Sequence, residues 1–240
     1  RSEGARLFDE ESPHLIVAAY SGPVSDGVAQ RSPTILGPNS RRKYDIRGAL
    51  RALWPAAQVH VQNDLTCAGY YYARQGYRDF CIITVGSGVG NKVFLDGHPH
   101  VGKRQLGGEI GHLRMSPQPE TAVAHLHAEL GQLASGRGTV WLAERWNSME
   151  GGRPLSSQPA SLENTPECAS ELLVNAFRSH DARAIRVVRA GAHPLALAIG
   201  AMHLGIGIDK FLIVGGFAKA LGEEYRTALV EMCHELTWEA

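Results

Sequence analysis

The chain alternates strand-length apolar runs with helical runs, and this alternation constrains its fold more than any other feature. Val59–Gln62 looks like a short strand that ends at Asn63-Asp64, and an Ala- and Tyr-rich stretch of helical character follows over Leu65–Arg74. Asp79–Val85 then has the length and β-branched composition of a buried strand. Strands that alternate with helices indicate α/β architecture with largely parallel pairing.

Asp64 stands where the first of these strands meets its helix. A carboxylate at such a junction commonly caps the following helix, so a structural cap is one interpretation. The functional interpretation is a general base at the carboxyl end of a strand, where open α/β sheets bind their ligands. One residue can do both, and both interpretations stay open.

A glycine-rich turn follows the strand Asp79–Val85. Gly86–Gly90 (GSGVG) separates it from a second strand-like run, Asn91–Leu95, and Asp96-Gly97 then forms a turn. Glycines at alternate positions allow a tight turn whose N–H groups can face a phosphate, although a plain hairpin needs glycine too. The pattern is not a P-loop, because no Gly-Lys-Ser/Thr follows, nor a dinucleotide fingerprint, because a strand comes after it.

A second acid lies beside a histidine in Gly107–His112 (GGEIGH). The paired glycines allow close backbone approach, and Glu109 and His112 lie on one side if the segment turns helically. A lone histidine is more often structural than a ligand. Here the acid and the glycines beside it favour a binding role.

Composition narrows the function classes. Lys plus Arg and Asp plus Glu number 24 each, so no global field recruits nucleic acid or an anionic membrane. The four cysteines (Cys67, Cys81, Cys168 and Cys233) lack C-x-x-C pairing, which fits a reducing cytoplasm. No apolar run approaches the length of a membrane span, and no signal peptide opens the chain. We therefore expect a cytoplasmic protein of one large or two small domains.

Several further elements are predicted from periodicity and turn signals. Pro194 should kink or break the longest of the helices. Gly151–Pro159 has the composition of a linker. The predicted strands are His14–Tyr20, which should be buried, and Phe211–Val214; the predicted helices are Asp45–Leu53, Glu120–Leu133, Thr139–Trp146, Thr165–Phe177, Asp181–His203 and Glu223–Leu236.

The ordered series of motifs resembles the ROK family of repressors, open reading frames and sugar kinases. The series is Asn63-Asp64, the Gly86–Gly90 turn, Asp96-Gly97 and Gly108–His112 (GEIGH). Further blocks that resemble the family are Ser21–Val24 (SGPV), Ala134–Gly136 (ASG) and Leu212–Gly216 (LIVGG). The similarity extends from about Leu15 to Glu231, and the series is specific although each motif alone is weak.

The resemblance implies an actin-like ATPase (ribonuclease H-like) fold with two α/β lobes around a cleft. Residues 1–64 would be the remainder of the small N-terminal lobe, and residues 65–240 the large lobe. Asp64 would deprotonate a sugar hydroxyl that attacks the γ-phosphate of ATP, with Mg²⁺ present. The remaining roles implied are sugar contacts by Asn63, Glu109, His112 and Asn39, phosphate contacts by Gly86, Ser87, Gly88 and Gly90, and adenosine contacts by Gly215 and Gly216.

One departure from the family concerns zinc. Many ROK proteins bind zinc through the GEIGH histidine and a CxCGxxGCxE block before the Ala-Ser-Gly. In this chain the three cysteine positions fall on Ala122, Ala124 and Glu129, and the final glutamate falls on Gly131. A structural zinc needs about four N or S ligands, so we expect none here. Gly131 has no side chain to bind the sugar as that glutamate does, and Glu129 could take its place only if the loop shifts.

Other departures are smaller. His125 and His127 are two apart in a stretch predicted to be helical, which points them to different faces and disfavours a metal site. Asn91-Lys92 replaces glycines that many family members carry. Arg1–Pro13 lacks the Asp-x-Gly-Gly-Thr hairpin of the kinases. We therefore expect a fragment without the N-terminal phosphate hairpin and without the C-terminal end.

We predict an ATP-dependent kinase that acts on a hexose, an amino sugar or a cyclitol. Two alternatives remain. ROK repressors join a helix-turn-helix to this domain and use it as a sugar sensor, and a pseudokinase would bind ligand without turnover. Retention of Asn63-Asp64 favours the kinase. Family analogy also predicts a homodimer, while neither a membrane nor nucleic acid is expected as a partner.

Overall fold

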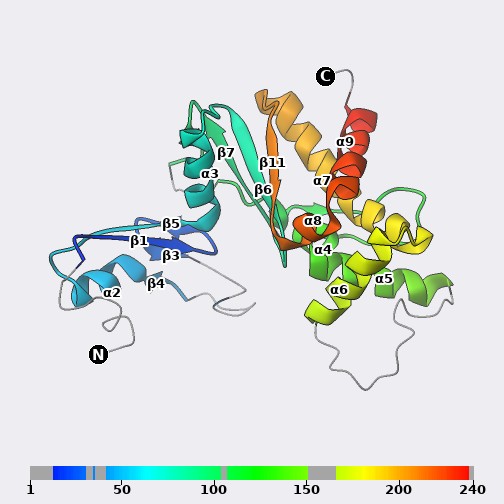
Figure 1. Ribbon diagram of the computed structural model, residues 1–240, viewed down its shortest axis with the longest axis horizontal. Coiled ribbons are helices and arrows are strands. Elements are labelled where there is room, and N and C mark those ends of the chain that lie inside the picture. The colour runs from blue at the N-terminus through cyan, green and yellow to red at the C-terminus, as the bar shows by residue number, and fades with distance from the viewer. Residues whose placement is uncertain (1–12, 31–34, 36–41, 104–106, 151–165, 238–240) are drawn as a thin grey trace. The chain divides into compact units, whose positions relative to one another are not determined.

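The computed structural model describes residues 13–30, 35, 42–103, 107–150 and 166–237 (Figure 1). Packing contacts divide the chain into two compact units. The first holds residues 1–78 and 96–107, and the second holds residues 79–95 and 108–240. The contacts group residues 65–78 with the first unit; the lobe boundary that we expect after Asp64 stays a prediction.

The first unit is built on a parallel strand pair. β1 (Leu15–Tyr20) pairs with β5 (Gln58–Asn63), in a register that runs from Leu15 opposite Gln58 to Tyr20 opposite Asn63. The other elements of this unit are β2 (Val24–Ser25), β3 (Val28–Ala29), β4 (Tyr44–Asp45), α2 (Ile46–Leu53), α3 (Asp64–Arg74) and β8 (His98–Pro99). β2, β3 and β4 form a small antiparallel sheet.

A small apolar core lies on one face of this pair. Alternate residues of β5, Val59 and Val61, are buried, and Ile16 and Ala18 of β1 pack against them. Leu15 and Val17 point the other way and are 56% and 63% exposed. The prediction of a fully buried strand is therefore wrong for β1, because the described residues of the unit pack on one of its faces only.

The second unit contains a mixed sheet covered by helices. β6 (Phe80–Val85) pairs antiparallel with β7 (Val89–Leu95) and parallel with β11 (Phe211–Val214). The other elements of this unit are η2 (Ile110–His112), β9 (Arg114–Met115), β10 (Ala128–Glu129), α4 (Leu130–Ala134), α5 (Gly136–Glu150), α6 (Pro166–Arg178), α7 (Ala182–Ile206), α8 (Gly216–Leu221) and α9 (Glu223–Leu236). α7 and α9 pack together beside the sheet (Figure 1). The α/β prediction is confirmed.

The hairpin of β6 and β7 has two buried faces. Cys81, Ile83 and Val85 project into the main core, among apolar residues of α6, α7 and α9. On the opposite face the rings of Phe80 and Phe94 stack with centroids 4.8 Å apart. A strand buried on both faces reads as a continuous apolar run, and this is why DFCIITV does not alternate.

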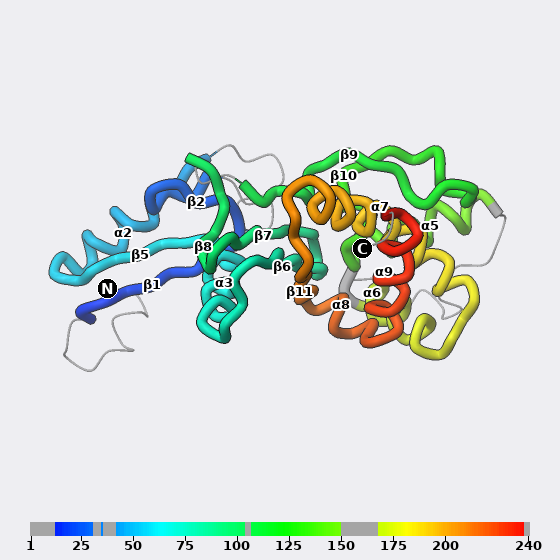
Figure 2. The backbone as a smooth tube through the Cα atoms, turned by 90° about the horizontal axis from the view of Figure 1, so that it is seen from above, coloured from blue at the N-terminus to red at the C-terminus, as the bar shows by residue number. Residues whose placement is uncertain are grey.

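The predicted helix Glu120–Leu133 is wrong except for its last turn. Residues 119–125 form turns and a bend, with Glu120 in a left-handed conformation at φ 62°. β10 then pairs with β9 before α4 begins (Figure 2). Tertiary pairing has overridden the helical propensity of the Ala- and Leu-rich stretch.

α7 (Ala182–Ile206) continues through Pro194, so the proline does not break the helix, and the alternative of a kink there stays a prediction. Asp181 caps its start by accepting hydrogen bonds from two backbone N–H groups, and Gly207 ends it at φ 71°. Its length and composition would allow it to span a membrane, contrary to our expectation for the chain, yet 61% of its most apolar window is buried inside the protein. Burial of this kind is typical of a core helix.

Candidate functional site

The junction of β5 and α3 carries the predicted base. Asn63, not Asp64, is the N-cap of α3: its Oδ1 accepts from the Thr66 N–H at 3.2 Å. The Asn63 Nδ2 donates to the Gly22 carbonyl at 3.0 Å and so ties the Ser-Gly-Pro turn to the helix start. Of the two interpretations of Asp64, the structural cap is therefore wrong by one residue. The capping asparagine is only 8% exposed.

Asp64 is consequently the exposed first residue of α3. Its Oδ1 accepts from the Leu65 N–H at 2.8 Å. The Asp64 carboxylate therefore lies at the positive end of the helix dipole. Burial, and secondarily the Asp64 charge, raises the pKa of the nearby Cys67 thiol. The arrangement leaves Asp64 as a solvent-facing carboxylate while Asn63 does the structural capping.

The glycine turn is shorter than the Gly86–Gly90 segment named from the sequence, because β7 already begins at Val89. The Gly86 N–H donates to the Gly88 carbonyl at 3.0 Å, and Gly90 lies within β7 opposite Thr84. Ser87 and Gly88 form the exposed tip. Of the four residues predicted to contact phosphates, Gly86 and Gly90 therefore shape the hairpin, and Ser87 and Gly88 present the tip.

Two further segments of the second unit approach this turn. The Gly136 N–H, at the start of α5, donates to the Gly86 carbonyl at 2.8 Å. Gly215 adopts φ 106°, and a Cβ placed on it would lie 2.6 Å from the Val85 carbonyl oxygen. A Cβ on Gly86 would lie 3.9 Å from the Gly216 nitrogen. Three glycine segments thus meet at the end of β6.

Sequence reasoning missed Arg137 at this place. Its Nε donates to the Ser87 carbonyl at 2.9 Å, which brings a guanidinium to the turn. The signal was a basic residue directly after the Ala-Ser-Gly block. A guanidinium, a helix N-terminus and a glycine turn form an arrangement suited to an anion.

The GEIGH segment lies against the edge of β7. Gly108 has φ 86°, and a Cβ on it would overlap the Asn91 carbonyl oxygen. A Cβ on Gly111 would overlap the Val89 carbonyl oxygen. Both positions therefore require glycine, which explains the glycine spacing of the motif.

His112 and Glu129 meet in the structure. The His112 Nδ1 and the Glu129 Oε2 are 3.0 Å apart, and the side chains are 50% and 40% exposed. The pairing of β9 with β10 brings Glu129 here, and the Leu130 N–H donates to the Leu113 carbonyl at 2.7 Å. The residue at a cysteine position of the family's zinc block is thus a hydrogen-bond partner of the GEIGH histidine.

Glu109 pairs with a lysine that stands out in the sequence only as a departure from the family. The Lys92 Nζ lies 3.1 Å from the Glu109 Oε1 and 3.2 Å from the Gly108 carbonyl oxygen. The lysine side chain is 3% exposed and the glutamate 31%. Part of the Glu109 carboxylate therefore faces solvent while a buried ammonium holds the rest.

Among the residues that the structure describes, no group of three or more His, Cys, Asp and Glu side chains could hold a metal ion. The His127 Nδ1 instead lies 3.4 Å from the Ser116 Oγ. Asn39, the remaining predicted sugar contact, lies outside the described residues.

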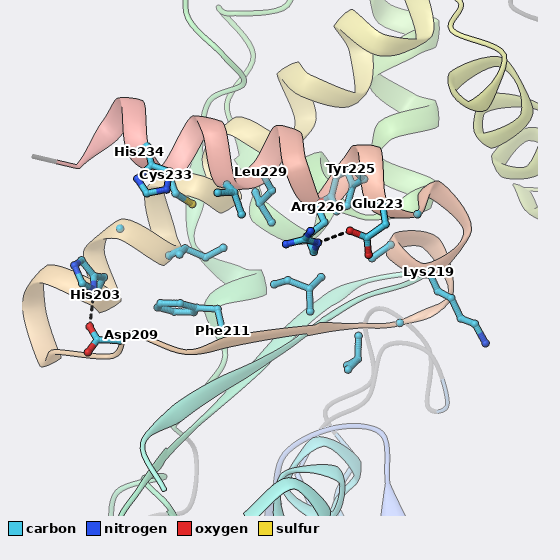
Figure 3. A pocket seen from close by; sticks show the side chains of 18 of the residues that line it. His203, Asp209, Phe211, Lys219, Glu223, Tyr225, Arg226, Leu229, Cys233 and His234 are labelled. Atoms are coloured by element: carbon cyan, nitrogen blue, oxygen red, sulfur yellow. Dashed lines mark hydrogen bonds and ion pairs between the residues drawn. The ribbon is translucent and has the colours of Figure 1, made fainter. Parts of the chain in front are cut away.

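A separate groove runs along β11 (Figure 3). Its volume is about 880 Å³, and apolar residues of β11, α7 and α9 line it, with Phe211 on the strand and Leu229 on α9. The Arg226–Glu223 and His203–Asp209 pairs lie at its sides. Gly215 lines the groove, whereas Gly86–Gly90, Glu109 and Glu129 do not. The groove therefore adjoins the glycine turn through Gly215 and does not include the GEIGH segment.

Comparison with known proteins supports the family assignment. The family model "ROK family" matches residues 11–237. The C(7)-cyclitol 7-kinase of Streptomyces hygroscopicus subsp. limoneus is 32% identical over 228 residues, which cover 89% of this chain and 62% of that protein. The kanosamine kinase of Amycolatopsis mediterranei is 26% identical over 220 residues, covering 91% of this chain and 67% of that protein.

The fold comparison agrees. The ROK hexokinase of Thermus thermophilus superposes with a TM-score of 0.67 at 25% identity, over 95% of this chain and 71% of that structure. The likeness confirms the predicted actin-like ATPase fold class. The chain spans about 62% of the length of the cyclitol kinase. Since the family match extends over nearly all of the sequence, this chain belongs to the ROK family.

Proposed function

We propose that this chain is the core of an ATP-dependent kinase that phosphorylates a hydroxyl group of a sugar-like ring, with cyclitols as the first substrate class. The observation that carries the proposal is the 32% identity with a C(7)-cyclitol 7-kinase over 89% of this chain. The likeness to a kanosamine kinase makes amino sugars the second class to test.

Asp64 is the proposed general base. Its exposure at the N-terminus of α3, and the transfer of the capping role to Asn63, support a carboxylate free to meet a substrate. Asp64 would accept the proton of the ring hydroxyl as the hydroxyl oxygen bonds to the γ-phosphorus and the bond to ADP breaks. A positioned base contributes roughly 10²- to 10⁴-fold to the rate.

The glycine turn is the proposed phosphate site. The exposed tip at Ser87 and Gly88, the guanidinium of Arg137 and the N-terminus of α5 offer donors to an anion, while Gly215-Gly216 would lie near the adenosine. Mg²⁺, arriving with the nucleotide, would neutralise charge on the phosphates. Gly86 and Gly90 would act by shaping the turn.

The acceptor ring would be held by hydrogen bonds from the second unit. Glu109, His112 and Glu129 each present a partly exposed side chain. A carboxylate accepts from ring hydroxyls, and an imidazole can donate or accept. Asn63 already donates to the Gly22 carbonyl and accepts from the Thr66 N–H. It would contact the ring only through the hydrogen-bonding capacity that these two bonds leave unused. Asn39 stays a predicted contact.

The test is ADP release with Mg²⁺-ATP across a panel of cyclitols, amino sugars and hexoses. We expect turnover on one compound and a loss of orders of magnitude in Asp64→Asn, with ligand binding retained. Asp26→Asn, which removes another exposed carboxylate of the first unit, is the matched control and should keep activity.

No turnover on any compound, with sugar binding intact, would instead favour the sensor or pseudokinase alternatives.

We further propose that the protein acts in the cytoplasm, as its neutral balance of charge and its scattered cysteines support, and that it forms a homodimer without a membrane or nucleic-acid partner. Light scattering of the purified protein tests the dimer.

A further inference from the structure

Two consecutive residues of β7 grip the GEIGH segment from opposite faces of the strand. Neighbouring strand residues point to opposite faces of the sheet. From one face the Asn91 Oδ1 accepts from the Ile110 N–H at 3.2 Å. From the other the Lys92 Nζ donates to the Gly108 carbonyl at 3.2 Å and to the Glu109 Oε1 at 3.1 Å.

The buried charge on Lys92 would destabilise the protein if its hydrogen-bond and ion-pair partners were missing. Its side chain lies on the same face of the hairpin as Ile82 and Phe94, and is only 3% exposed. A buried ammonium is tolerated when a carboxylate and hydrogen-bond acceptors compensate it. The Glu109 carboxylate and the Gly108 carbonyl provide that compensation, so the lysine ties the position of this glutamate to the strand.

The backbone leaves the segment little room to move. Side-chain atoms at Gly108 and Gly111 would overlap the carbonyl oxygens of β7, so the segment lies in direct contact with the strand. Asn91 is itself fixed, since its Nδ2 donates to the sulfur atoms of Cys81 and Met202 at 3.7 Å. We call Asn91 and Lys92, with the segment 108–112 that they hold, the clamp. Through Asn91 the clamp is anchored in the core.

We propose that Lys92 is a positioning residue of the acceptor site: it fixes the Glu109 carboxylate for a ring hydroxyl, while Asn91 fixes the backbone of the same segment. The inference rests on the proposed function for the role of Glu109. A carboxylate that is oriented before substrate arrives loses less freedom on binding. Lys92 does not touch the substrate and acts through Glu109.

The test is a double-mutant cycle with Lys92→Met and Glu109→Gln. Each single variant should raise the KM for the acceptor by about 10- to 100-fold, with a smaller change in kcat and an unchanged KM for ATP. The acceptor KM of the double variant should lie within about threefold of the higher of the two single-variant values, because both substitutions break the same ion pair. Additive losses would overturn the proposal.

A control variant tests whether the loss of any ion pair in the second unit raises the acceptor KM. Arg189→Met breaks the Arg189–Glu231 pair elsewhere in that unit and should leave the acceptor KM unchanged. Glu109→Gln leaves the buried ammonium of Lys92 without its carboxylate. If that variant does not fold, the double variant leaves no uncompensated charge, and its acceptor KM should equal that of Lys92→Met. A further loss in the double variant would contradict the clamp.

Amide hydrogen exchange of residues 108–112 separates this inference from the proposed function. Lys92→Met, or the double variant where the single does not fold, should lose protection in this segment while Arg189→Met keeps it. Unchanged protection would overturn the clamp even in an active enzyme. A wild-type protein without turnover on any acceptor would overturn the proposed function, and the exchange result would still decide on the clamp.

Discussion

The glycine turn and the GEIGH segment both lie in the second unit, but they are built from different groups. The turn is made of backbone: Gly86, Gly136 and Gly215 come together through carbonyl and amide contacts. In the GEIGH segment side chains from distant places, Lys92 and Glu129, complete the arrangement. A backbone-built region should be sensitive to added atoms. The GEIGH segment shares that sensitivity at Gly108 and Gly111, and its side-chain pairs should make it sensitive to removed charges as well.

The largest expected effect is that of Gly215→Ala. Its φ of 106° and the contact of a new Cβ with Val85 combine backbone strain with overlap. We expect a loss of about 2 to 4 kcal/mol in the free energy of unfolding. Urea denaturation measures it, and a loss below about 0.5 kcal/mol would contradict the backbone-built description of the turn.

Glu129→Gln should have an intermediate effect confined to the acceptor. The glutamine keeps the size of the side chain but removes the charge beside His112. We expect the acceptor KM to rise about 3- to 10-fold with the KM for ATP unchanged. Steady-state kinetics checks this, with Glu224→Gln, from the exposed His180–Glu224 pair, as the matched control. A change in the KM for ATP alone would contradict the proposal that Glu129 contacts the acceptor.

The thiol behind the clamp should make stability depend on pH. Burial raises the pKa of Cys81 to about 11, and the hydrogen bond from Asn91 opposes this. The unfolded thiol ionises first, so its contribution to stability is complete below about pH 8.5 and is lost as the pH rises towards 11. Chemical denaturation at several pH values should show a shallower decline in Cys81→Ala than in Cys168→Ala, since Cys168 is exposed.

Gly88→Ala should have the smallest effect. A Cβ there would meet no atom within 4 Å, and the exposed tip has no left-handed conformation to strain. We expect stability within about 0.5 kcal/mol of the wild type and nucleotide affinity within about threefold. Calorimetric titration with ATP tests it. A collapse of affinity would mean that the turn is filled by ligand up to the Cα of Gly88.

Local signals in the sequence were sufficient for most elements. Glu223–Leu236 and Phe211–Val214 have the predicted bounds, and α6 begins with proline at its first position. Errors arose where tertiary contacts outweighed local preference. β10 displaced a predicted helix by pairing with β9, and α7 accommodated Pro194 inside a buried helix.

The sequence by itself determined the family, the α/β class and most of the candidate residues, though not Arg137 or the role proposed for Lys92, because motif order and hydrophobic period are local properties of the chain. Only the tertiary structure decided which residues are partners. The capping role passed from Asp64 to Asn63 through one turn of backbone geometry. Lys92 met Glu109, and Glu129 met His112, because strand edges bring residues 17 positions apart into hydrogen-bond distance. Such pairings depend on register and loop path, which no spacing in the sequence specifies.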